Sequence, residues 1–130
     1  MRTLIVEDDF TSRILLQSFL AQYGECHIAV NGKEAIAAFR AGQQSGNHYD
    51  LICMDIMMPE MDGKTAVREI RAIEEAGGTL SSDGVKIIMT TALDDVKNVM
   101  QSFKELCDAY VIKPIDTRKL LGYIEELQLV

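Results

Sequence analysis

The sequence contains no run of lysine or arginine and no long hydrophobic segment, and each absence excludes a class of protein. It has 13 basic residues against 20 acidic ones, and its formal net charge is −7. An acidic chain repels nucleic acid and anionic lipid unless it holds a local basic patch, so we expect no direct nucleic-acid partner and no membrane partner. The apolar runs have the length of strands, far below the roughly 20 residues of a membrane helix. No charged leader precedes an apolar stretch at the N-terminus, and we expect no signal peptide.

Cysteine is also scarce. Cys26, Cys53 and Cys107 are odd in number, match no metal-site spacing and lie among apolar neighbours. We interpret them as free thiols in a reducing cytoplasm, the predicted location of the protein. The chain has no internal repeat, low-complexity tract or linker. Its 130 residues and 48% hydrophobic content suit one globular domain, which we assign to residues 1–130.

Short apolar runs alternate with segments of helical periodicity along the whole chain. The predicted strands are Thr3–Val6, Cys26–Val30, Leu51–Met54, Val85–Met89 and Tyr110–Ile112. The predicted helices are Phe10–Tyr23, Asn31–Arg40 with Gly42 as its stop, Asp62–Ala76, a segment near Asp94–Leu106, and Asp116–Leu127. The third strand is apolar on both faces, as is typical of a central parallel strand covered by helices. The pattern predicts a single doubly wound (βα)5 domain of the α/β class, with a flavodoxin-like parallel sheet in the order 2-1-3-4-5.

Polar residues follow four of these strands, at the edge where open α/β sheets bind ligands. They are Glu7, Asp8 and Asp9 after the first strand, Asp55 at the end of the third, Thr90 and Thr91 after the fourth, and Lys113 after the fifth. Several carboxylates in one site repel each other, and a divalent cation removes that repulsion. Oxygen ligands favour Mg2+, and the lack of His and Cys at these positions argues against Zn2+. Mg2+, Lys113 and the Thr91 hydroxyl would together let an aspartate attack a phosphoryl group.

Four segments at these strand ends carry a closer likeness: Val6–Asp9, Met54–Gly63, Met89–Ala92 and Tyr110–Pro114. In this order and spacing they resemble the response-regulator receiver family of two-component signalling, and the resemblance covers the whole chain. It implies that Asp55 accepts a phosphoryl group from a histidine kinase or a phosphotransfer protein. It also implies an Mg2+ site in which Asp9 binds directly, Asp8 binds through water, and Asp55 and the Met57 backbone carbonyl complete the protein ligands.

The resemblance further implies a conformational switch. Thr91 matches the switch hydroxyl, Lys113 the lysine that pairs with the phosphoryl group, and Tyr110 the aromatic residue that turns inward. The bond before Pro114 is expected to be cis. The implied output is a protein partner that binds the face of the fourth helix, the fifth strand and the fifth helix. Because the chain ends after its last predicted helix, we expect a single-domain response regulator that catalyses only its own phosphorylation and dephosphorylation, rather than a turnover enzyme.

Three alternatives compete with this interpretation. A Mg2+-dependent phosphohydrolase with an aspartyl-phosphate intermediate would need a second acid near Asp55 to activate water, and apolar residues 56–58 follow instead. A flavin or nucleotide binder would need a Ser/Thr/Gly-rich loop after the first strand, where this chain is acidic. A pseudo-receiver that only docks would not need its acceptor, acids and lysine. Taken singly, Asp8 and Asp9 also fit the start of a helix, Lys113 an exposed lysine and Tyr110 a core residue.

Two local features refine the expectation. Met57 and Leu93 should flank the phosphoryl group, and neither can orient a hydrolytic water, so we predict slow self-dephosphorylation. The family usually carries Gly-Ala before the fifth strand, whereas this chain has Leu106-Cys107 followed by Asp108-Ala109.

Overall fold

A parallel sheet with helices on both faces organises the chain. The structure is a computed structural model that describes residues 1–58, 60–79, 83–92, 96–97 and 106–130. Its strands are β1 (Thr3–Val6), β2 (Cys26–Ala29), β3 (Leu51–Asp55), β4 (Lys86–Thr91) and β5 (Ala109–Ile112). Its helices are α1 (Phe10–Leu20), α2 (Gly32–Ser45), α3 (Gly63–Ala76) and α5 (Thr117–Glu126), and the short 3-10 helix η1 (Ala21–Tyr23) follows α1.

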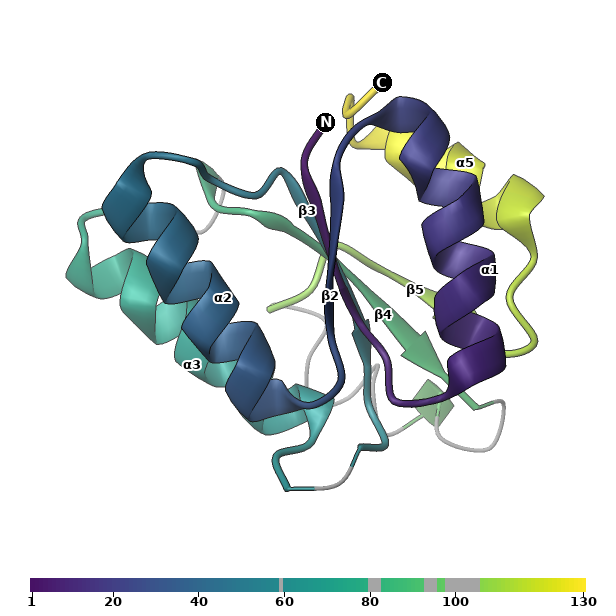
Figure 1. Cartoon of the computed structure of the whole chain (residues 1–130), viewed down its shortest axis with the longest axis horizontal. Coiled ribbons are helices and arrows are strands. Elements are labelled where there is room, and N and C mark those ends of the chain that lie inside the picture. Colours follow the sequence, from purple (N-terminus) through teal and green to yellow (C-terminus); the bar gives the residue numbers. More distant parts are fainter. Residues whose placement is uncertain (59, 80–82, 93–95, 98–105) are drawn as a thin grey trace.

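The strands pair in the order β2-β1-β3-β4-β5, all parallel, which confirms the predicted sheet. Helices α2 and α3 cover one face, and α1 and α5 cover the other (Figure 1). The sheet residues on the α2/α3 side include Leu4, Val6, Ile52, Met54, Ile87 and Met89. Those on the α1/α5 side include Ile5, Leu51, Cys53, Ile88 and Val111. Successive strand residues alternate between the faces, so a strand covered on both sides is apolar throughout.

Each of the four longer helices in the described residues begins at a side chain that caps it. Asp9, Asn31, Asp62 and Asp116 are the N-caps of α1, α2, α3 and α5, and each accepts a hydrogen bond from a backbone N–H in the first turn. Such caps satisfy donors that the helix itself cannot pair. They fix where each chain segment leaves the carboxyl edge of the sheet.

Several boundaries differ from the prediction, and two of these differences, at the ends of α2 and β4, have a cause in the packing. Helix α2 continues through Gly42 to Ser45 and ends at Gly46, whose φ of 78° is left-handed. Gly42 is buried, and a Cβ there would lie 2.8 Å from the Asn47 carbonyl oxygen, so the absence of a side chain lets the following loop approach the helix closely. Strand β4 runs two residues beyond Met89, because residues 90 and 91 pair with β5.

The fourth predicted helix, the membrane expectation and the thiols each have an outcome. The helix predicted near residues 94–106 lies almost entirely outside the described residues. Among the described helices, none is long and apolar enough to cross a membrane. Cys26, Cys53 and Cys107 are free, as predicted.

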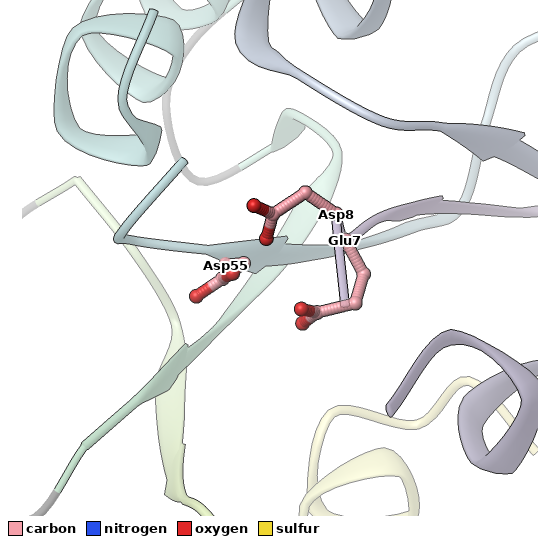
Figure 2. A group of neighbouring side chains, drawn as sticks. All are labelled: Glu7, Asp8 and Asp55. Atoms are coloured by element: carbon pink, nitrogen blue, oxygen red, sulfur yellow. The ribbon is translucent and has the colours of Figure 1, made fainter. Parts of the chain in front are cut away.

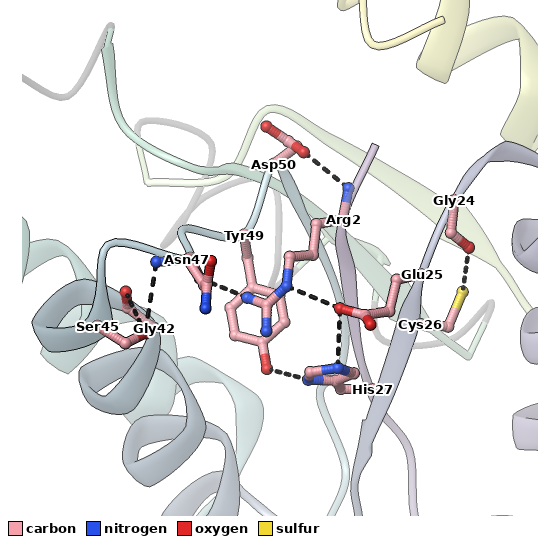
Figure 3. Close-up of polar contacts among 10 residues, drawn as sticks. All are labelled: Arg2, Gly24, Glu25, Cys26, His27, Gly42, Ser45, Asn47, Tyr49 and Asp50. Carbon is pink, nitrogen blue, oxygen red and sulfur yellow. Dashed lines mark hydrogen bonds and ion pairs between the residues drawn. The ribbon is translucent and has the colours of Figure 1, made fainter.

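The amino edge of the sheet is closed by a polar network around Arg2 (Figure 3). The Arg2 Nε atom donates to Glu25 at 3.0 Å, and its guanidinium stacks 4.5 Å from the centre of the Tyr49 ring. The Tyr49 hydroxyl lies 2.7 Å from His27 Nδ1, and the Arg2 backbone N–H donates to Asp50 at 2.7 Å. These contacts tie β1, β2 and the start of β3 together at the end opposite the carboxyl edge.

Candidate functional site

The alternation of strand residues brings four polar side chains to one place. Glu7, Asp55, Thr90 and Lys113 each come two residues after a member of the α1/α5 core cluster, namely Ile5, Cys53, Ile88 and Val111. Residues two apart in a strand share a face. The four side chains therefore continue the α1/α5 face of the sheet at its carboxyl edge: Asp55 and Thr90 are in β3 and β4, and Glu7 and Lys113 directly follow β1 and β5.

Lys113 joins the two buried acids of this edge. Its Nζ lies 3.0 Å from Glu7 Oε1 and 3.3 Å from Asp55 Oδ2. Asp55 is 4% exposed, and its Oδ1 accepts from the Met57 N–H at 3.3 Å. Glu7 is fully buried; its Oε1 also accepts from the Asp9 N–H, while its Oε2 has no hydrogen-bond partner among the described residues. A buried carboxylate oxygen without a partner is costly.

Three carboxylates converge beside this lysine. One ligand oxygen from each of Glu7, Asp8 and Asp55 lies within 4.8 Å of the other two. Figure 2 shows Glu7 and Asp8 directed from the end of β1 toward Asp55 at the end of β3. Asp8 is exposed and the other two are buried, so the group opens to solvent on one side. All-oxygen donors of this kind suit a hard cation such as Mg2+.

The structure does not bring Asp9, the residue expected to bind Mg2+ directly, into this carboxylate group. Its carboxylate accepts from the Ser12 N–H at 2.9 Å as the N-cap of α1, and it is not a member of the carboxylate group. The acidic pair next to Asp55 is Glu7 and Asp8, one residue earlier than predicted. A signal was available in the sequence: Glu7 directly follows the strand Thr3–Val6 and, two residues after Ile5, shares its face.

The pKa values of the site reflect its crowding. Burial raises the pKa of Asp55, the nearby Glu7 charge raises it further, and Lys113 offsets this only in part, which leaves the pKa at about 7. Burial works against the Lys113 ammonium, but its bond to Glu7 and the charges of Asp55 and Glu7 outweigh this, so its pKa is raised. The Ser12 hydrogen bonds lower the pKa of Asp9. Without a cation, the three-carboxylate group therefore holds a proton near neutral pH.

The family model of the response regulator receiver domain matches residues 3–125. The chain belongs to this family. The receiver domain is 35% identical over 128 residues to the regulatory protein VanRB of Enterococcus faecalis. This match covers 98% of the present chain and 52% of VanRB. It spans about half or less of the curated regulators that it matches.

Solved structures share the fold. One is a chain of the co-crystal structure of the Saccharomyces cerevisiae histidine phosphotransfer signaling protein Ypd1 and the receiver domain of its downstream response regulator Ssk1. It has a TM-score of 0.83 and 29% identity, and the match covers 98% of this receiver domain and 88% of that chain. The receiver domain of the sensor histidine kinase PA1611 from Pseudomonas aeruginosa, solved with magnesium in its active site cleft, has a TM-score of 0.77 over 97% and 95% of the chains. At 24% identity that likeness shows the fold alone.

The expected switch residues of the receiver domain lie on the other side of the sheet. Thr91 follows Met89 on the α2/α3 face, is 1% exposed, and donates to the Ala92 carbonyl at 3.2 Å. Tyr110 is half-buried, packs against the α2/α3 core cluster and pairs in register with Met89. Both residues therefore share a face. The bond between Lys113 and Pro114 is cis, as expected.

Of the two residues expected to flank the phosphoryl group, Met57 can be placed. It directly follows the loop residue after Asp55, and it is 71% exposed. Leu93 lies outside the described residues. Of the predicted site residues, Asp55 and Lys113 are in contact, Asp8 joins them through the carboxylate group, and Thr91 and Tyr110 lie on the opposite face.

Proposed function

We propose that this receiver domain accepts a phosphoryl group on Asp55 from a phosphohistidine. The observation that carries the proposal is the convergence of a buried aspartate, a lysine and two further carboxylates at one sheet edge. In the transfer, Asp55 Oδ forms a bond to phosphorus as the imidazole N–P bond breaks, and the electron pair of that bond stays on the histidine. Lys113 remains near the acceptor and balances charge on the phosphoryl oxygens.

The residues of the site fit Mg2+. Glu7, Asp8 and Asp55 offer closely spaced oxygens, and Glu7 Oε2, which has no partner in the described part of the chain, is a buried acceptor that a cation would satisfy. We propose these three carboxylates and the Met57 carbonyl as the protein ligands. When bound, Mg2+ neutralises the carboxylates and the transferred phosphoryl oxygens. Asp9 then acts through its cap, which positions α1 beside the site.

The phosphodonor is proposed to be a histidine kinase or a phosphotransfer protein. The yeast receiver domain that resembles this one was crystallised with such a phosphotransfer protein. Phe10 and Ile14 lie one helical turn apart on α1 and are 66% and 44% exposed, and Met57 adds a third exposed apolar side chain near Asp55. Exposed apolar side chains on the helix that directly follows the acidic residues, and on the loop after Asp55, suit docking of a protein rather than a small phosphoester.

The response to phosphorylation is proposed to be a population shift at Thr91 and Tyr110. The phosphoryl group would draw the Thr91 hydroxyl from its bond with the Ala92 carbonyl, and Tyr110 would move inward on the same face. The remodelled surface would include β5 and α5, where a protein partner could bind. Whether the domain acts alone stays a prediction, as do its cytoplasmic location and its lack of nucleic-acid partners.

A direct test is incubation with acetyl phosphate in the presence and absence of Mg2+, followed by intact mass measurement. The wild type should gain one phosphoryl unit only with Mg2+, and Asp55→Asn should gain none. Slow loss of the label after removal of the donor is expected from the apolar Met57. Absence of labelling in the wild type, or equal labelling of Asp55→Asn, would contradict the proposal, and multiple turnover of the phosphodonor would favour a phosphohydrolase.

A further inference from the structure

Thr90 lies at the centre of the site but has no assigned part in it. It is in β4, between β3 and β5, and pairs in register with Asp55 on one side and Val111 on the other. It is 1% exposed and follows Ile88 on the α1/α5 face of the sheet. Neighbouring parallel strands lie about 4.8 Å apart, so the Thr90 side chain stands directly beside the base of the Asp55 side chain.

The path of Lys113 leads across Thr90. Lys113 directly follows β5, yet its ammonium contacts Asp55 in β3 and Glu7, which directly follows β1. Strand β4 lies between β5 and both of these acids. To reach them on the α1/α5 face, the lysine side chain must cross the position that Thr90 occupies on that face.

The Thr90 hydroxyl is free to interact there. Its Oγ1 is buried and has no hydrogen-bond partner among the described residues. Thr3 Oγ1 is also unpaired, but it lies at the amino edge of the sheet, and the neighbouring Thr91 faces the other side and already donates to a carbonyl. An ammonium has three donors, and Lys113 uses two of them for Glu7 and Asp55.

We propose that Thr90 is a positioning residue for Lys113, and that its hydroxyl accepts the third N–H of the ammonium during phosphoryl transfer. The inference rests on the proposed function and adds a residue to it. As Asp55 Oδ becomes bonded to phosphorus, it loses its negative charge, and Lys113 must move from the carboxylate to a phosphoryl oxygen. A fixed acceptor beneath the lysine keeps the ammonium within reach of both positions.

The test uses two substitutions that separate shape from hydrogen bonding. Thr90→Val keeps the shape and removes an unpaired buried hydroxyl, so it should fold at least as well as the wild type. With acetyl phosphate and Mg2+, we expect Thr90→Val to label Asp55 about three- to tenfold more slowly, the effect of one lost hydrogen bond. Thr90→Ser retains the hydroxyl and should restore most of the rate. Mg2+ affinity, measured by titration calorimetry, should be unchanged in both variants.

A double-mutant cycle shows whether Thr90 acts through Lys113. In a Lys113→Met background, Thr90→Val should cause no further slowing. Wild-type labelling in Thr90→Val, or equal slowing with and without Lys113, would overturn the inference while leaving the phosphoacceptor function intact. Failure of the wild type itself to label would instead reject the proposed function.

Discussion

Glu7 is a fully buried glutamate that directly follows a buried strand, and its neighbours divide two tasks. Asp8 turns toward Asp55, whereas Asp9 turns away and caps α1. The division follows from geometry, because consecutive residues at a strand end point in different directions. One acidic run can thus supply both a cation site and a helix cap.

Asp8→Asn and Asp9→Asn form a matched pair that separates these tasks. Asp8→Asn should weaken Mg2+ binding by at least about tenfold, since the number of ligand charges sets the affinity of such sites. Asp9→Asn should leave Mg2+ binding nearly unchanged and cost little stability, because Asn and Asp cap helices about equally well. Titration calorimetry and thermal unfolding measure the two effects. If Asp9→Asn is the variant that loses Mg2+, the assignment of Glu7 and Asp8 as the acidic pair is wrong.

Asp55 should make the metal-free protein less stable as pH rises. Its ordinary pKa is 3.8 and its folded-state pKa is about 7. Between these values the folded state holds a proton that the unfolded state has lost, so this group's contribution to stability falls as pH rises through the window and is constant above it. Each pKa unit corresponds to about 1.4 kcal/mol. In EDTA, Asp55→Asn should therefore gain stability over wild type between about pH 5 and about pH 8.

Urea unfolding of both proteins at the two pH values measures this difference. Parallel changes in the wild type and Asp55→Asn would show that Asp55 is not the group responsible. Addition of Mg2+ should reduce the difference, because a ligand that binds only the folded state stabilises it.

At the scale of elements, Arg71 forms a buried ion pair with Glu74 inside α3 and also ties α3 to the segment that leads into β5. Arg71 Nη1 lies 2.6 Å from Glu74 Oε1 and Nη2 lies 3.3 Å from Asp108 Oδ2, while Nε donates to the Leu106 carbonyl at 2.9 Å. The second Glu74 oxygen accepts from the Val85 N–H at 2.7 Å. The residues that stand where the family usually has Gly-Ala are thus anchored from α3.

Arg71→Met should lower the free energy of unfolding by about 3 kcal/mol, because it leaves the Glu74 carboxylate buried without its cation. The side chains of Arg71 and Glu74 are only 10% and 3% exposed. Arg118→Met is the control: that side chain is 93% exposed and lies 3.8 Å from Asp116, so its loss should cost less than about 1 kcal/mol. Denaturant unfolding compares the two, and equal losses would mean that burial does not distinguish these pairs.

For the molecule as a whole, the alternation of strands and helices predicted a doubly wound sheet, and the usual arrangement of such sheets supplied the strand order. Strand-end chemistry and the receiver resemblance predicted that Asp55 meets Lys113. They did not predict features that depend on contacts distant in sequence. Gly42 resembles a helix stop, but the loop packed against it lets the helix continue. Strand β4 is extended by pairing with β5, which lies some 20 residues later in the chain. The position of the acidic pair depended on where β1 ends, and one residue reverses the direction of a side chain.

Phosphorylation at the carboxyl edge should change the environment of the Tyr110 side chain, on the opposite face of the sheet. The chain has four tyrosines and no tryptophan, so fluorotyrosine labelling gives few 19F resonances, and Tyr110→Phe assigns the relevant one. Tyr110 is half-buried, and on phosphorylation its resonance should lose sensitivity to exchange of H2O for D2O as the ring turns inward. Tyr49, buried at the amino edge, is an internal control that should not change.

In Thr91→Val, the Tyr110 resonance should keep its sensitivity to solvent even when Asp55 is fully phosphorylated, because no hydroxyl is drawn to the phosphoryl group. An equal response of Tyr110 in Thr91→Val would show that the signal crosses the sheet by a route other than β4.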